Sequence, residues 1–187
     1  MKTKYSYLCV LIILLFQSGC LYIARYDGPY HGKVVDAQTR EPIEGVVVLG
    51  TWSVQHVNVA GGYHTYYDAR ETVTDKNGEF LIPGQGLRVM SGLEKMSVLI
   101  FKSGYQNIGS LAWDSIKIAY KDEIKWEGEM PIFPIKKLTM EERKKRLFGK
   151  ESVPDEKQLL LIRELNRERV FIGLPPLQAR AINQTKK

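Results

Sequence analysis

The sequence predicts a mainly β protein, a β-sandwich followed by a C-terminal helical extension. Short strand-like runs separated by turn residues extend from Tyr30 to about Pro134, a rhythm typical of sandwiches and barrels. After Pro134 the chain is rich in charge, and apolar residues recur at helical spacing. An uncharged apolar run precedes both parts. We therefore expect segment boundaries that divide the chain into residues 1–19, 20–29, 30–135 and 136–187.

The N-terminal segment has the order of a secretory signal. Lys2 and Lys4 come before the apolar run Tyr7–Phe16, and the small residues of Ser18–Cys20 follow it. This segment resembles a bacterial lipoprotein signal, which implies that residues 1–19 are removed and that Cys20 becomes the lipidated first residue. Two alternatives stay open. One is an uncleaved membrane anchor, although a spanning helix needs about 20 apolar residues; the other is a plain signal peptide cut near Ala24.

Cysteine usage favours lipidation. Cys9 lies within the apolar run and would leave with the signal, so Cys20 would be the only cysteine of the mature chain. An exported chain with a single cysteine has no internal disulfide, and acylation, for example with palmitate, gives the odd cysteine a role. Residues 20–29 would then form a tether. Because Leu21 rather than Asp follows the cysteine, the resemblance implies attachment to lipid of the outer membrane, facing the periplasm.

Turn chemistry and apolar patterning define the strands of the predicted sandwich. Val46–Leu49 is an unbroken apolar run, which suits a strand buried on both faces. Asp75–Gly78 is a hairpin turn, because Asn and Gly accept the positive φ that such turns need. The predicted strands are Lys33–Asp36, Gly45–Trp52, Glu71–Asp75, Glu79–Ile82, Met96–Lys102, Ile116–Tyr120 and Ile124–Glu127.

Four sequence blocks of this region are similar to a known family. They are Gly32–Asp36, Glu41–Val48, Thr74–Phe80 and Phe101–Tyr105, in this order. Together they resemble the carboxypeptidase regulatory-like domain, which implies a transthyretin-like, seven-stranded β-sandwich. The resemblance gives structural roles to Ile43 and Phe80 in the core and to Tyr105 at an edge, and it carries over no catalytic residue. Related hydrolases end in Tyr-Arg-Gly-Ser, which this chain lacks.

The segment between Trp52 and Arg70 is too long for a short hairpin loop. Long loops on a rigid sandwich often carry binding sites. The candidate binding residues are Trp52, His56, Tyr63, His64, Tyr66 and Tyr67. An exposed, concave platform of the three tyrosines would favour carbohydrate binding. We favour an extended hairpin whose tyrosines pack on the sheet, because strand-like alternation continues on both sides of Gly61 and Gly62.

The sequence contains no recognisable catalytic or metal motif. His31, His56 and His64 lack the spacing of a zinc site, and neither Gly-x-Ser-x-Gly nor a glycine-rich phosphate loop is present. We therefore expect no enzyme activity, no metal and no cofactor. Removal of Lys2 and Lys4 with the signal would lower the net charge from +6 to +4, which is mild. The basic residues are spread along the chain, apart from Lys136, Lys137 and residues 143–146, which we interpret as a solvated helix face, so no nucleic-acid partner is expected.

These observations predict a non-enzymatic, membrane-anchored lipoprotein of the cell envelope. Its sandwich would serve as an interaction or binding module, with an envelope protein or a polysaccharide as partner. Two alternatives are kept: a carbohydrate-binding module that uses the aromatic segment from Trp52 to Tyr67, and a hydrolase with an unrecognised site.

Two helices are expected in residues 136–187. Thr139–Glu142 has the pattern of a capping box, and the helix that it starts would reach Phe148 and end at Gly149. A second helix would run from Pro154 to Phe171, with an apolar stripe that includes Leu161 and Leu165. The stripe could bind a partner. We favour docking on the sandwich, because short isolated helices are marginal in water.

Overall fold

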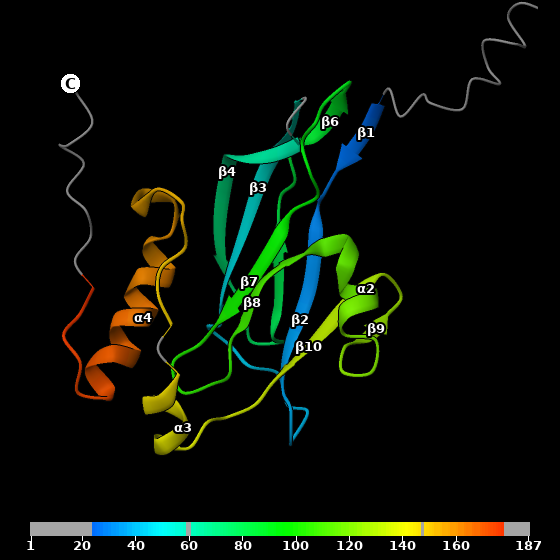
Figure 1. Cartoon of the computed structure of the whole chain (residues 1–187). Helices are drawn as coiled ribbons and strands as arrows, with labels where there is room; N and C mark the ends of the chain where they lie inside the picture. The colour runs from blue at the N-terminus through cyan, green and yellow to red at the C-terminus, as the bar shows by residue number, and fades with distance from the viewer. Residues whose placement is uncertain (1–23, 59–60, 147, 178–187) are drawn as a thin grey trace, which may run out of the picture.

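The computed structural model describes residues 24–58, 61–146 and 148–177. Strands account for 44% of the structure and helices for 19%, which confirms the prediction of a mainly β protein. Figure 1 shows the strands in the centre, with α4 (Leu159–Phe171) along one side and α3 (Met140–Lys145) at one end.

Eight strands form two four-stranded sheets that do not close into a barrel. The first sheet has the order β5 (Glu79–Ile82), β2 (Tyr30–Asp36), β10 (Met130–Ile135) and β9 (Lys125–Glu127), with β2 and β10 parallel. The second has the order β4 (Gly61–Val73), β3 (Val47–Asn58), β7 (Ser97–Phe101) and β8 (Ile108–Ala112), with antiparallel neighbours.

The main core lies between these two sheets. Val34 and Phe133 from the first sheet and Val48 and Ile100 from the second belong to one cluster of buried side chains. Ile43 and Phe80 also belong to this cluster, and Tyr105 packs against it while partly exposed, as predicted. This two-layer arrangement is consistent with a β-sandwich.

A second core lies on the other face of the β3–β7 sheet, beneath α4. Leu49 and Leu99 from the sheet pack with Leu161 and Leu165 from the helix. Docking of the apolar stripe within the chain is therefore confirmed. This second core also explains the unbroken run Val46–Leu49, because alternate residues of a strand face opposite sides and both sides are buried here.

The helices of the C-terminal region differ at their boundaries from the prediction. The capping box is present, since Thr139 Oγ1 accepts from the amide of Glu142 and the Glu142 carboxylate accepts from the amide of Thr139. The helix ends at Lys145, before Phe148, whose ring stacks on Phe101 of the sheet with 5.6 Å between centroids. That contact requires the chain to leave the helix early.

The predicted helix from Pro154 to Phe171 is split into a short 3-10 turn, Asp155–Lys157, and α4. Gln158 interrupts it, because its buried side chain donates to the carbonyl oxygens of Glu151 and Val153, at 2.9 and 2.7 Å. The first free amides of α4 find an acceptor in the sheet instead. Glu71 of β4 accepts from Leu160 and Leu161 at 2.8 and 2.7 Å and so caps the helix from outside its own segment.

One predicted strand was wrong. Ile116–Tyr120 is not a strand: a 3-10 turn, Trp113–Ser115, leads into the short helix α2 (Ile116–Ala119). Ile116 is fully buried while Ile118 is 84% exposed, an arrangement that a strand, in which residues i and i+2 share a face, would not allow.

The predicted tether, residues 20–29, also contains structure. Ala24–Asp27 is the strand β1, which pairs antiparallel with β6 (Gly86–Val89) in a two-stranded ribbon. Figure 1 shows this ribbon at the same end of the molecule as the end of β3 and the start of β4, away from α3. The ribbon went unpredicted because its partner strands lie far apart in the sequence.

Candidate functional site

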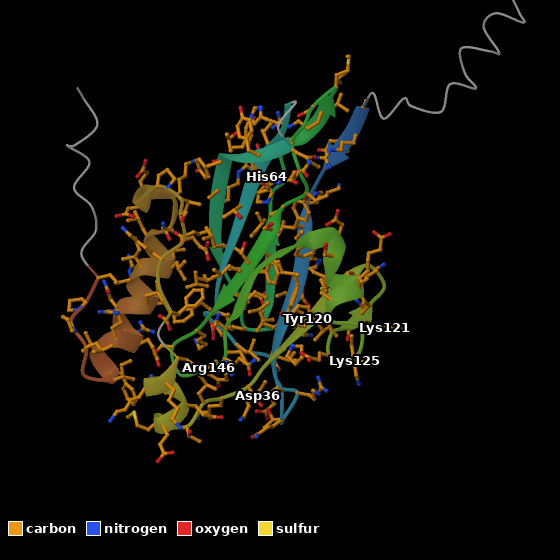
Figure 2. The ribbon with its side chains drawn as sticks, in the orientation of Figure 1. Asp36, His64, Tyr120, Lys121, Lys125 and Arg146 are labelled. Atoms are coloured by element: carbon orange, nitrogen blue, oxygen red, sulfur yellow. The ribbon has the colours of Figure 1, made fainter. Side chains whose placement is uncertain are left out.

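The segment between Trp52 and Arg70 forms the extended hairpin that we favoured. β3 and β4 pair from Val47 with Val73 to Asn58 with Gly61, and the register shifts between Trp52 and Ser53. The hairpin reaches beyond the body of the sheet, and His64 marks its outer part in Figure 2. The candidate residues on it do not all share one surface.

Trp52 belongs to the core and not to a binding surface. Its side chain is 1% exposed, and its indole Nε1 donates to Asp27 Oδ2 at 2.8 Å. Asp27 is buried as well and also accepts from the Tyr30 hydroxyl at 2.5 Å and from the Gln85 amide at 3.0 Å. Burial raises the pKa of the Tyr30 phenol above its ordinary value, and the hydrogen bond to Asp27 acts in the same direction. This network fixes the β1–β6 ribbon to the sheets.

The three tyrosines of the hairpin are about half exposed, so they do not pack fully onto the sheet as we expected. Tyr63, Tyr66 and Tyr67 are 51%, 41% and 45% exposed. The Tyr63 ring stacks on His56 with 4.9 Å between centroids, and the Arg88 guanidinium lies 5.3 Å from the centre of the Tyr67 ring. Two of the rings thus already have a partner within the chain, which leaves less open face for a sugar.

His64 joins a polar cluster that combines a serine, a histidine and a carboxylate. Glu94 Oε2 accepts from Ser53 Oγ at 2.6 Å and lies 2.9 Å from His64 Nδ1. A nucleophilic triad requires the histidine between the hydroxyl and the acid, so that the imidazole removes the proton. Here the carboxylate stands in the middle, so this cluster does not have the arrangement of a Ser–His–acid triad.

A hollow of about 270 Å3 lies between the ribbon and the segment that follows it. It is lined by Arg25, Gln55, Arg88, Ser91, Gly92, Leu93 and Glu94. Arg25 and Arg88 are directly paired across the ribbon. Arg25 Nη2 and Arg88 Nε are buried without a hydrogen-bond partner in the described structure. No sequence pattern indicated this site, because only the register of the ribbon brings the two arginines together.

A second hollow, of about 360 Å3, lies toward the opposite end of the molecule. Its lining includes Arg40, Asn107, Tyr120, Asp122 and Lys136. Figure 2 shows Tyr120 and Asp36 in this part of the structure, well away from His64. Arg40 has a φ of 65°, an uncommon conformation for a residue with a side chain. Because the lining carries both positive and negative side chains, the hollow suits a polar partner but does not indicate one ligand class.

The lipidation site predicted from the sequence, Cys20, lies outside the described residues. In the part of the chain that the structure describes, no group of three or more His, Cys, Asp or Glu side chains could hold a metal ion. No helix in that part is long and apolar enough to cross a membrane.

Comparisons with protein families, with curated proteins and with solved structures gave no match to this chain.

Proposed function

We propose that the protein is an exported lipoprotein, anchored in the cell envelope through an acylated Cys20, whose two-sheet body is a non-enzymatic interaction module. The proposal rests on the basic, apolar and small-residue order that ends in Cys20. One structural observation supports it: β1 begins at Ala24, four residues after this cysteine. Four residues span at most about 14 Å, so a lipid on Cys20 would hold the ribbon end of the body close to the bilayer.

The finer fold is part of the same proposal: a transthyretin-like sandwich of the carboxypeptidase regulatory-like kind. Its support is the placement of three of the four sequence blocks. Gly32–Asp36 lies in the central strand β2, Ile43 enters the core, and the turn at Asp75–Gly78 returns the chain so that Phe80 is buried. These placements are consistent with the scaffold roles that the resemblance implies.

In this proposal the end away from the ribbon faces the aqueous space and meets the partner. The hollow lined by Arg40, Tyr120 and Lys136 lies toward that end and is open to an envelope protein or a polysaccharide. Carbohydrate binding through Tyr63, Tyr66 and Tyr67 is the second candidate, because these rings are about half exposed. It ranks lower because His56 and Arg88 already cover two of them.

Metabolic labelling with a palmitate analogue tests the anchor. The wild-type chain and the matched variant Cys9→Ser should both be labelled and found in the membrane fraction, because Cys9 is predicted to leave with the signal. Cys20→Ser should be unlabelled. Mass spectrometry of the purified product should show a chain that begins at acylated Cys20. A soluble wild-type product with an unmodified Cys20 would refute the proposal.

A further inference from the structure

We propose that the β1–β6 ribbon and the adjoining hollow form a second membrane contact, which binds the phosphate groups of anionic phospholipids. The inference rests on the proposed function, since the anchor at Cys20 supplies the proximity. It concerns other residues, however, and can fail independently of the anchor.

One face of the ribbon is apolar and exposed. Ala24 pairs with Val89 and Tyr26 with Leu87, and directly opposed residues of an antiparallel pair share a face. Tyr26 and Leu87 are each 66% exposed and Val89 is 55% exposed. Met90, next in the chain, is 86% exposed. Such grouping of large apolar side chains on a small ribbon marks an interaction surface, whereas single exposed apolar residues do not.

The other face of the ribbon carries uncompensated positive charge. Arg25 and Arg88 are cross-strand neighbours, and like charges in that position are destabilising. Among the described residues, neither arginine forms an ion pair with a carboxylate. Each also has a buried guanidinium nitrogen without a hydrogen bond. A bound anion would relieve both costs, because guanidinium groups bind phosphate oxygens through paired, charge-assisted hydrogen bonds.

The hollow beside the arginines offers neutral polar groups as well. Gln55 and Ser91 line it, and the Ser91 hydroxyl, which accepts from the Leu93 amide at 3.2 Å, can donate its own proton. Glu94 is the one carboxylate in the lining, and Ser53 and His64 already engage it through Oε2. The side of the hollow that the ribbon forms therefore presents mainly hydrogen-bond donors to a ligand.

The combination of an apolar face with adjacent arginines selects a bilayer surface over a free anion. Apolar side chains can enter the interface while guanidinium groups reach the headgroups. Because Cys20 and Ala24 are at most about 14 Å apart, a lipid on Cys20 would bring the ribbon within reach of the bilayer interface. The ribbon is also held rigidly, since the buried Asp27 at the end of β1 joins it to Tyr30 and Trp52. The position of the ribbon relative to the two sheets is thus fixed by the fold.

Vesicle co-sedimentation with the full-length Cys20→Ser chain tests the contact without the anchor. We expect binding to vesicles that contain about one-quarter phosphatidylglycerol, weak binding to pure phosphatidylcholine, and loss of binding at high salt. Arg25→Gln with Arg88→Gln should lower the partition coefficient about fivefold for each lost charge. The matched control is Lys121→Gln with Lys125→Gln, which removes the same charge from the other end of the molecule and should change the partition little.

A second measurement uses the acylated protein in proteoliposomes. Val89→Trp should be quenched by brominated phospholipid, whereas Ile118→Trp on α2 should not, although Ile118 is the more exposed of the two, at 84% against 55%. The proposal would be overturned if the arginine and the lysine double variants lowered the partition coefficient equally. Equal quenching at Val89→Trp and Ile118→Trp would overturn it as well. Binding of inorganic phosphate at the arginines without preference for vesicles would assign the site to a free anion and would overturn it too. Unlabelled Cys20 would contradict the anchor alone.

Discussion

Replacing Glu168 by Ala should release the C-terminal helices from the sheets, because this carboxylate joins three parts of the chain. It accepts from Arg143 Nε and Nη2 at 2.8 and 2.6 Å, and from Ser103 Oγ and the Gly104 amide at 2.8 Å each. Arg143 comes from α3, Glu168 from α4, and the serine and glycine from the turn after β7. The Arg143 guanidinium also lies 3.7 Å from the centre of the Phe171 ring.

The expected loss is about 3 kcal/mol of unfolding free energy, since removing one partner of a buried pair leaves an uncompensated charge at a cost of about 3–5 kcal/mol. We take the lower end of this energy range because the side chains of Arg143 and Glu168 keep 12% and 13% of their surface exposed. Burial acts to raise the pKa of Glu168, but the hydrogen bonds from Arg143, Ser103 and Gly104 outweigh it and hold the pKa below its usual range. This stabilisation is therefore complete above the unfolded pKa of about 4.3 and is lost as the pH falls through the lower folded value.

Urea unfolding of the Cys20→Ser chain, followed by circular dichroism at neutral pH and again near pH 3, measures this loss. At neutral pH Glu168→Ala should lower the midpoint by about 1–2 M. The matched control is Arg163→Ala on the same helix, whose exposed side chain forms no ion pair among the described residues and which should cost under about 0.5 kcal/mol. A double-mutant cycle with Arg143→Ala should show strong coupling. Additive losses of unfolding free energy in that cycle, or equal midpoints for the Glu168 and Arg163 variants, would refute the reasoning.

Three further predictions concern stability. Glu71→Ala should cost about 1–2 kcal/mol and speed hydrogen exchange of the first amides of α4, because the helix loses its cap; unchanged exchange would argue against that role. Asp27→Asn should cost about 2 kcal/mol and shift the fluorescence of Trp52, since the amide offers a single acceptor oxygen to its donors; an unaltered spectrum would contradict this. Gly84→Ala should prevent stable folding, because its Cβ would stand 1.9 Å from the Asp27 carbonyl oxygen, whereas Gly109→Ala meets nothing within 4 Å and should melt like the wild type in a thermal scan.

The sequence predicted well where the structure depends on neighbours in the chain. The turn at Asp75–Gly78 forms as expected, with the Asp75 carboxylate accepting from the amides of Asn77 and Glu79. The capping box at Thr139 is equally local. Both features join residues only a few positions apart, so residue type and spacing were sufficient to find them.

Prediction failed where a distant contact overrides the local pattern. Phe148 leaves its helix to stack on Phe101, and Gln158 turns its amide inward and divides the second helix. Trp52 looked like part of an aromatic binding segment, yet its indole reaches the buried Asp27. Each of these contacts forms with residues whose proximity the sequence does not reveal.

Residue types and their spacing were enough to predict a mainly β chain, its local turns and caps, and the signal-like order that ends in Cys20. Long-range contacts were needed to find that Ala24–Asp27 is a strand, that α4 covers one face of the β3–β7 sheet, and that Arg25 stands opposite Arg88. The difference comes from strand register. A strand's partner, and hence the neighbours of each side chain, depends on burial and hydrogen bonding across the whole molecule, whereas turns and caps depend on a few adjacent residues.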